Sequence, residues 1–365
     1  MKKLLIPIIA ISIASCSQPS TTIKGNSDKI TYIGRTLRDN PETPRQWAAG
    51  AYYTFGFSDD LCLLYITNEY TSERNNILEI AIDDLPSQKI RTNSKHNTIV
   101  VGKAQHCNDS IANPLYVYQD LQAGYHHITV CRNSETAMGY TQLDSVKAKT
   151  IGKWTSGDKL KIEFIGNSIT CGAEADTADT PQKDYIWGDW HRAYMSYGAQ
   201  TARMLQAQYS LVSVSGIGLI HSCCDMEITM PQVYNKYILR NNEITYDFKD
   251  FRPDIICSCL GQNDGIQDSA KFCDTYTEFI RQVSARNPSA RYFVLLTSPM
   301  ADQQLKEWLE KMLKSIAKRL NDNGIPNVTC FTFSKSWNSG GASHPSVEEH
   351  TQIAEELTAH IKTLL

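Results

Sequence analysis

A serine and a histidine in the second half of the chain have the types and positions needed to attack an ester. Ser168 lies in the segment Gly-Asn-Ser-Ile, directly after an apolar run at 162–165 and a glycine. A serine hydroxyl is weakly nucleophilic and needs an adjacent base, normally a histidine. Of nine histidines, only His344 lies in a glycine-rich turn followed by a proline. Ser168 taken alone would decide little, because a serine after a strand is also a common helix N-cap.

Two further segments carry groups that could stabilise the negative charge formed when a serine attacks an ester. One contains Gly216 and the other Asn263, and each follows an apolar run, at 211–214 and 255–260. A glycine N–H and an asparagine amide are suitable donors to an oxyanion. Glycines at strand ends usually form turns and Asn-Asp pairs often cap helices, so these residues carry weight only in combination.

The pattern of apolar runs predicts how these four segments come together. After residue 150, short apolar runs alternate with segments of helical period, which calls for a parallel sheet covered by helices on both faces. Ligands of such sheets bind beyond the carboxyl ends of the strands, where all four segments would lie. The expected strands are 162–165, 211–214, 255–260, 292–297 and 328–331, and the expected helices are 194–207, 271–286, 303–323 and 347–364.

The first half of the chain has a different pattern, with short runs of β-branched and aromatic residues separated by polar turns. Such spacing is typical of an antiparallel sandwich or jelly roll. We therefore predict a β-sandwich domain at 27–150 and an α/β domain at 151–365, with the boundary in the polar stretch 150–157. The expected strands are 51–57, 61–67, 77–83, 98–102, 115–121, 127–131 and 140–147.

Taken in order, the four segments resemble the sequence blocks of the SGNH (GDSL-type) hydrolase superfamily. The matches are Gly-Asn-Ser-Ile at Ser168, then Gly216, Gly-Gln-Asn-Asp at Asn263, and His-Pro-Ser at His344. The resemblance implies a three-layer α/β/α domain with Ser168 as nucleophile and His344 as general base. It also implies an oxyanion hole made by the backbone N–H of Ser168, by Gly216 and by Asn263, with Gly218 as the second choice of glycine.

A β-sandwich followed by an SGNH domain is similar to carbohydrate esterase family 2. Looser matches to that family occur at 32–36, 49–52 and 196–199. The resemblance implies a carboxylic ester hydrolase that removes acetyl groups from plant polysaccharides such as xylan and glucomannan, without a cofactor or metal. It also implies aromatic residues that contact the sugar, for which Trp187, Trp190 and Trp337 are the candidates. For each of the three taken singly, packing in the core or at an interface is favoured over a sugar contact.

The sequence departs from the superfamily pattern at the third member of the catalytic triad. Relatives usually place an aspartate three residues before the histidine, where this chain has Gly341. Either a backbone carbonyl near Gly341 orients His344, giving a Ser-His dyad, or another carboxylate reaches in. The family includes such dyads, so we expect a dyad. Asp264, Glu174 and Glu348 are the carboxylates to test, and Asn167, where most relatives have aspartate, is expected to be a turn and helix-start residue.

The N-terminus has the pattern of a bacterial export signal. Two lysines precede an apolar run at 4–14, which is too short to span a bilayer. The following Ala-Ser-Cys16 resembles a lipoprotein box, which implies lipidation of Cys16 after removal of the signal. An ordinary cleaved signal is the alternative. We predict a signal peptide at 1–16, a tether at 17–26, and lipid anchoring to the cell envelope, periplasmic or on the cell surface, as the sole membrane contact.

Composition bears on the partner, on the state of the cysteines and on the class of protein. The net charge is −3 and no basic stripe is present, which argues against a nucleic-acid partner. Eleven cysteines show no dense disulfide framework and no metal-binding spacing, so we expect most to be buried small hydrophobes. A lipase or thioesterase of longer acyl chains is the alternative enzyme, but the polar flanks 171–184 and 337–341 favour a small acyl group. A non-catalytic carbohydrate-binding lipoprotein is the alternative outside enzymes.

Overall fold

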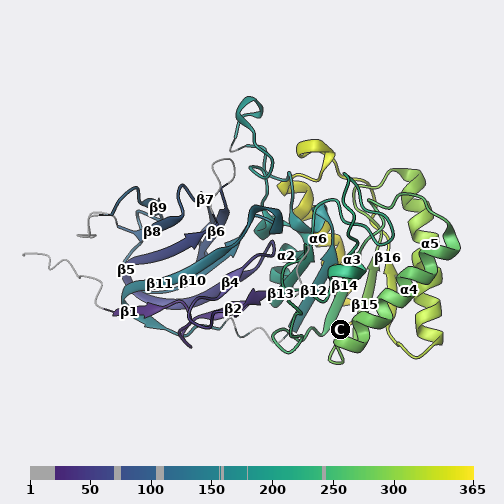
Figure 1. The fold of residues 1–365 in the computed structure, drawn as a ribbon, viewed down its shortest axis with the longest axis horizontal. Coiled ribbons are helices and arrows are strands. Elements are labelled where there is room, and N and C mark those ends of the chain that lie inside the picture. The colour runs from purple at the N-terminus through teal and green to yellow at the C-terminus, as the bar shows by residue number, and fades with distance from the viewer. Residues whose placement is uncertain are drawn as a thin grey trace, which may run out of the picture.

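The computed structural model describes residues 21–69, 75–103, 111–155, 157, 160–178, 180–240 and 244–365. The chain forms an antiparallel β-sandwich domain followed by an α/β domain, side by side in Figure 1. The predicted signal peptide, with Cys16, lies outside the described residues. Within the described ranges, no helix is long and apolar enough to cross a membrane.

The β-sandwich domain is built around one long strand, β5. Its first half pairs with β10, its second half with β8, and β11 pairs along both halves. Eleven strands among the described residues join this sheet, and every pair is antiparallel except β8 with β9. The strands are β1 (Thr21–Lys24), β2 (Thr31–Ile33), β3 (Thr36–Leu37), β4 (Arg45–Gln46), β5 (Tyr52–Asn68), β6 (Ile77–Ile82), β7 (Gln88–Arg91), β8 (His96–Gly102), β9 (Leu115–Val117), β10 (Tyr125–Arg132) and β11 (Thr141–Gly152).

Two predictions for this domain differ from the structure. The runs 51–57 and 61–67 form the single strand β5. The three polar residues between them, 58–60, lie at an irregularity in the pairing with β11 and do not make a turn. The predicted tether 17–26 is wrong over Thr21–Lys24, which pairs with β11 as strand β1. The sheet therefore begins earlier than the composition of this polar segment indicates.

The α/β domain contains a five-stranded parallel sheet in the order β13-β12-β14-β15-β16. The first strand, β12, lies between the second and the third, so the chain reverses direction across the sheet at β12. Crevices at such a switch point bind ligands in open α/β sheets. The strands are β12 (Leu160–Gly166), β13 (Ala207–Ser213), β14 (Ile255–Cys259), β15 (Tyr292–Leu296) and β16 (Val328–Phe331).

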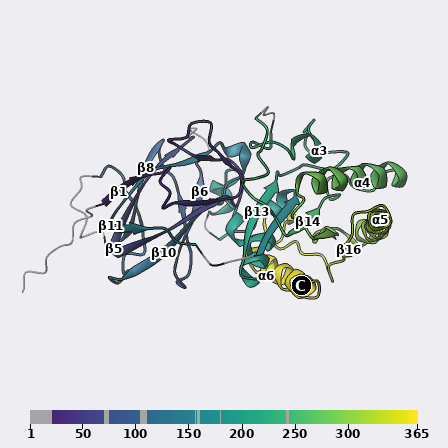
Figure 2. The ribbon, with the colours of Figure 1, turned by 90° about the horizontal axis from the view of Figure 1, so that it is seen from below.

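Helices cover both faces of this sheet, as Figure 2 shows for α4 above the strands and α6 below them. Side chains alternate along β12, with Phe164 packing in the core under α2 and α6 and Ile165 in the core under α4 and α5. The helices are α1 (Ser168–Cys171), α2 (Tyr197–Met204), α3 (Met230–Val233), α4 (Ser269–Arg286), α5 (Gln303–Asp322) and α6 (Val347–Lys362), with short 3₁₀ turns at Gln182–Asp184, Ala193–Met195 and Gly341–Ser343.

The predicted helix 194–207 is longer than the helix that forms. A 3₁₀ turn precedes Ser196, whose side chain accepts a hydrogen bond from the N–H of Ala199 and caps α2. Gln206, with φ of +51°, then turns the chain, and β13 begins at Ala207. The apolar pattern continues through this tight connection, so the sequence does not indicate where α2 ends and β13 begins. The cysteines of β14 are buried and unpaired, as predicted for Cys257 and Cys259.

Candidate active site

Ser168 and His344 meet at the carboxyl end of β12. Their Oγ and Nε2 atoms are 2.9 Å apart, and Ser168 is 8% exposed. Ser168 is the first residue of α1, and the side chain of Asn167 accepts a hydrogen bond from the N–H of Ile169 at 3.2 Å. The prediction that Asn167 starts this helix is confirmed. The first N–H groups of a helix have no partner inside the helix, so the N–H of Ser168 is free of intrahelical bonding.

The turn before α6 orients His344 through its own backbone. Nδ1 of His344 lies 3.2 Å from the carbonyl oxygen of Ala342 and 3.3 Å from that of Gly341. Ala342 and Ser343 both adopt left-handed conformations, with φ of +46° and +60°, which fold the turn back on the imidazole. If Nδ1 carries the proton, these carbonyls hold it there and leave Nε2 as the acceptor facing Ser168.

Burial holds the pKa of His344 below its ordinary value of 6.5, although the Ala342 carbonyl and the charge of Glu174 act to raise it. A histidine with a lowered pKa is neutral at pH 7, which is the form a general base requires. The electrostatics of the site therefore suit proton acceptance from Ser168.

Gly341, at the position of the missing aspartate, has no room for a side chain. A Cβ atom there would lie 2.6 Å from the ring of Trp190 and 2.8 Å from a carboxylate oxygen of Glu174. The backbone of Gly341 is itself held, because its N–H donates to the carbonyl of Glu174 at 2.8 Å. Glu174 is buried and its carboxylate accepts a hydrogen bond from Tyr185. The Glu174 carboxylate thus lies near the turn, but it accepts its hydrogen bond from Tyr185 and not from His344.

The other two carboxylates singled out from the sequence have different partners. Asp264 is 3% exposed and accepts hydrogen bonds from the consecutive N–H groups of Leu219, Ile220 and His221. Glu348 is exposed and accepts a hydrogen bond from the Ser346 hydroxyl at 3.0 Å. Asp264 therefore ties the loop after β14 to the loop after β13, and Glu348 lies at the start of α6.

Gly216 and Asn263, the expected oxyanion donors, lie on these two connected loops. Gly216 has φ of +83°, a conformation that favours glycine, and is partly exposed. The Asn263 amide donates to the carbonyl of Ile217 at 2.7 Å, which leaves its second N–H for another acceptor. Gly218, the second choice, is buried and its N–H donates to Ser222 Oγ at 2.9 Å, so Gly216 is the better placed glycine.

Ser168, Gly216, Asn263 and His344 follow β12, β13, β14 and β16 respectively, and the parallel order of these strands gathers them at one edge of the sheet. A family model for the GDSL-like lipase/acylhydrolase family matches residues 164–351, which include all four. The chain belongs to this family.

Curated and solved relatives of this GDSL-like protein extend the likeness to both domains. An acetylxylan esterase / glucomannan deacetylase of Cellvibrio japonicus is 26% identical over 100% of this chain and 99% of its own length. A cellulase/esterase, CelE, of Acetivibrio thermocellus is 29% identical over 96% of this chain and 41% of its own. A family two carbohydrate esterase from Cellvibrio japonicus superimposes with a TM-score of 0.79, at 23% identity, over 94% of this chain and 97% of its own.

A second solved relative is a family two carbohydrate esterase from Clostridium thermocellum in complex with cellohexaose. It superimposes with a TM-score of 0.76 at 25% identity and covers 92% of this chain and 98% of its own. The fold of a β-sandwich followed by an α/β hydrolase domain is thus shared with these esterases along nearly the whole chain.

The three tryptophans predicted to contact a sugar have different surroundings in the GDSL-like fold. Trp337 is 1% exposed and packs on Phe333 in the core, so its assignment as a substrate contact is wrong. Trp190 is 5% exposed and supports Gly341 beneath the His344 turn, which makes it a packing residue as well. Trp187 is partly exposed, with its ring 5.0 Å from that of His191, and it alone of the three remains a candidate sugar contact.

Sequence reasoning missed Glu135, which reaches this site from the β-sandwich domain. Its fully buried carboxylate accepts hydrogen bonds from the N–H of Ser215 at 2.8 Å and from His191 at 3.3 Å. Burial opposes its ionisation, but the interactions with His191 and Ser215 outweigh that effect and bring the pKa of Glu135 to about 2. An ionised carboxylate from one domain thus holds the residue before Gly216 in the other.

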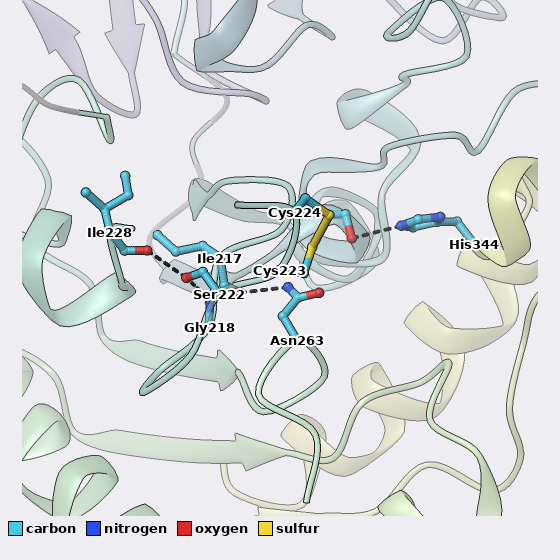
Figure 3. Close-up of a disulfide and its surroundings, with 9 residues drawn as sticks. Ile217, Gly218, Ser222, Cys223, Cys224, Ile228, Asn263 and His344 are labelled. Atoms are coloured by element: carbon cyan, nitrogen blue, oxygen red, sulfur yellow. Dashed lines mark hydrogen bonds between the residues drawn. A yellow bond between two sulfur atoms is a disulfide. The ribbon is translucent and has the colours of Figure 1, made fainter. Parts of the chain in front are cut away.

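The sequence also failed to identify the bond between Cys223 and Cys224. The two adjacent residues form a disulfide in the loop after β13. Figure 3 shows it in one view with the Asn263 amide and the imidazole of His344. The expectation of buried, unpaired thiols is confirmed for most described cysteines but is wrong for this pair, of which Cys224 is exposed.

Proposed function

We propose that this chain is a serine esterase that removes acetyl groups from plant polysaccharides of the acetylxylan or acetylglucomannan type. The observation that carries the proposal is the 2.9 Å contact between Ser168 Oγ and His344 Nε2 at the sheet edge that also bears Gly216 and Asn263. The names of the relatives that match across both domains support the choice of acetylated glycans as substrates.

Acylation follows from this arrangement. His344 Nε2 accepts the proton of Ser168 while Oγ attacks the acetyl carbonyl carbon. The N–H groups of Ser168 and Gly216 and the amide of Asn263 donate to the resulting oxyanion. Protonated His344 then gives its proton to the departing sugar oxygen, which leaves an acetyl group on Ser168. A water molecule, deprotonated by His344, releases acetate by the same route in reverse.

The proposed base works as a member of a Ser-His dyad. In a triad, a carboxylate fixes the tautomer of the histidine and stabilises its charged form. Here the carbonyls of Gly341 and Ala342 would fix the tautomer, because both lie within hydrogen-bond reach of Nδ1. The charge of Glu174 acts in the same direction as a triad acid by raising the pKa of His344.

The location of the enzyme is a separate proposal that rests on its N-terminal sequence. Export followed by lipidation of Cys16 would place the enzyme on the cell envelope, periplasmic or at the surface, with the membrane contacted only through the lipid. Labelling with a palmitate analogue in cells should mark the wild type and spare Cys16→Ala. Equal labelling of the two would refute lipidation at Cys16.

Acetate release from acetylated xylan and glucomannan tests the function directly. The wild type should release acetate and Ser168→Ala should release none above background, while both keep the same melting temperature. Ser269→Ala is the matched control, because Ser269 is exposed at the start of α4 and should not affect turnover. Binding of these glycans without acetate release would instead support a non-catalytic carbohydrate-binding protein.

Acyl-chain preference separates the proposal from a lipase or thioesterase. With acetyl through octanoyl esters of one leaving group, kcat/KM should fall steeply beyond about four carbons. Faster hydrolysis of octanoyl than of acetyl esters would move the assignment to longer acyl chains.

A further inference from the structure

The loop between β13 and α3 carries a disulfide between neighbouring residues, Cys223 and Cys224, at the edge of the active site. Cys223 is partly exposed and Cys224 is exposed, so a reductant in solution can reach the bond. Figure 3 shows the disulfide together with Asn263 and His344. The other cysteines of the described ranges are unpaired, and only Cys273 and Cys330 among them are not buried.

Cys223 contacts Gly216 in two ways, of which the second involves the disulfide sulfur. The N–H of Cys223 donates to the carbonyl oxygen of Gly216 at 2.8 Å. The Sγ atom of Cys223 also packs against Gly216, because a Cβ built on that glycine would lie only 3.1 Å from it. Gly216 is followed by Ile217, whose carbonyl accepts the amide hydrogen bond of Asn263. Cys223 is therefore connected to both proposed oxyanion donors outside α1.

Hydrogen bonds fix the loop up to Ser222, and beyond it the N–H of Met226 donates to the carbonyl of Cys223 at 3.1 Å, while the disulfide adds a covalent restraint on Cys223 and Cys224. Ser222 Oγ accepts from the N–H of Gly218 and donates to the carbonyl of Ile228 at 2.6 Å. Directly after it, Cys224 and Asp225 have φ of +62° and +57°. L-residues avoid this left-handed region, where glycine or asparagine is preferred. The small ring closed by the disulfide restrains Cys224, so cleavage would remove that restraint and let Cys224 leave its left-handed conformation.

We infer that the Cys223–Cys224 disulfide is a redox-sensitive positioning element of the oxyanion hole. The inference rests on the proposed role of Ser168 as the nucleophile of an ester hydrolase. A dithiol reduces the bond in two exchanges: its first thiolate attacks one sulfur and forms a mixed disulfide, and its second thiol displaces the enzyme sulfur. Two cysteine thiols and one oxidised dithiol result, and Cys223 is then free to move away from Gly216.

The test measures turnover of p-nitrophenyl acetate before and after treatment with dithiothreitol at constant temperature. Reduction should lower kcat by on the order of tenfold or more, since an oxyanion donor is displaced, with KM little changed. Titration should show two new thiols, and reoxidation should restore kcat. A circular-dichroism melt should show that the reduced enzyme remains folded at the assay temperature.

Two variants identify the cysteines responsible. Cys223→Ser/Cys224→Ser should have the low kcat of the reduced wild type and should not respond to dithiothreitol. Cys273→Ser/Cys330→Ser, the matched control that removes the partly exposed unpaired thiols, should keep both the wild-type kcat and its response. An unchanged kcat after full reduction of a folded wild type would overturn the inference, as would a fully active Cys223→Ser/Cys224→Ser variant.

A fluorophosphonate probe separates this inference from the proposed substrate. The rate at which the probe labels Ser168, followed by intact mass, depends on the oxyanion hole and not on the natural acyl donor. Labelling should slow on reduction and recover on reoxidation. If the enzyme releases no acetate from glycans but labelling still responds to reduction, the proposed substrate fails and the redox inference stands. If acetate release is normal and the labelling rate does not change on reduction, the redox inference fails and the proposed function stands.

Discussion

Replacing Asn263 with alanine separates its two possible roles, because each predicts a different size of effect on a different quantity. The amide makes one hydrogen bond in the structure, to the Ile217 carbonyl at 2.7 Å. Losing such a bond costs about 1 kcal/mol of folding stability, which lowers the melting temperature of a domain of this size by roughly 2 to 4 °C. Losing an oxyanion donor instead costs about 2.7 to 4 kcal/mol in the transition state, or roughly 10²- to 10³-fold in kcat.

The assay therefore measures kcat with p-nitrophenyl acetate and the melting temperature of the same preparation. Asn263→Ala should lose on the order of 10²-fold or more in kcat. The matched control is Asn323→Ala, which removes an amide hydrogen bond of 2.7 Å to the Arg319 carbonyl at the far end of α5. The control should lose stability and keep its kcat. If Asn263→Ala keeps kcat within about tenfold of wild type, Asn263 is only a tie between two loops and the oxyanion assignment is refuted.

The remaining predictions concern the base and the sugar contact. Because burial lowers the pKa of His344 and the neutral form is active, kcat/KM should fall toward acid with a midpoint below pH 6.5; a midpoint above 6.5 would contradict this. Glu174→Gln should shift that midpoint further toward acid and cost less than about tenfold in kcat; a loss near 10⁴ would make Glu174 a relocated triad acid. Trp187→Ala should raise KM for acetylated xylan but not for p-nitrophenyl acetate; equal effects on both would exclude a sugar contact.

The elements that position the site could be predicted because their signals are local. Each strand of the α/β domain is a short apolar run. The segments of Ser168, Gly216 and Asn263 follow such runs closely, and that of His344 lies just before the last helix, α6. The strand at 328–331 has the predicted bounds, and α4 and α5 begin or end within two residues of theirs. The order of the segments along a parallel sheet then brings Ser168 and His344 together, and the structure has them 2.9 Å apart.

The features that could not be predicted depend on contacts between distant parts of the chain. Trp337 has a side chain of the type that stacks on sugars, but it is buried because it packs on Phe333 in the core. Glu135 belongs to a loop of the first domain, and nothing local to it indicates that Ser215 of the second domain will donate to it. Cys223 and Cys224 are adjacent in the sequence, but spacing does not indicate the backbone conformation in which their sulfur atoms are joined.

Glu135 gives the β-sandwich domain a structural role beside the active site. Removing that domain would leave the Ser215 N–H without its acceptor and the fully buried His191 without the carboxylate of Glu135, next to the active site. Unpaired buried polar groups are costly, so the loop that carries Gly216 would have to rearrange. Ser215, the residue before Gly216, is thus held by a carboxylate of the first domain, and Gly216 itself contacts Cys223 of its own loop. The β-sandwich would therefore be a structural part of the proposed oxyanion hole, whatever part it also takes in binding a glycan.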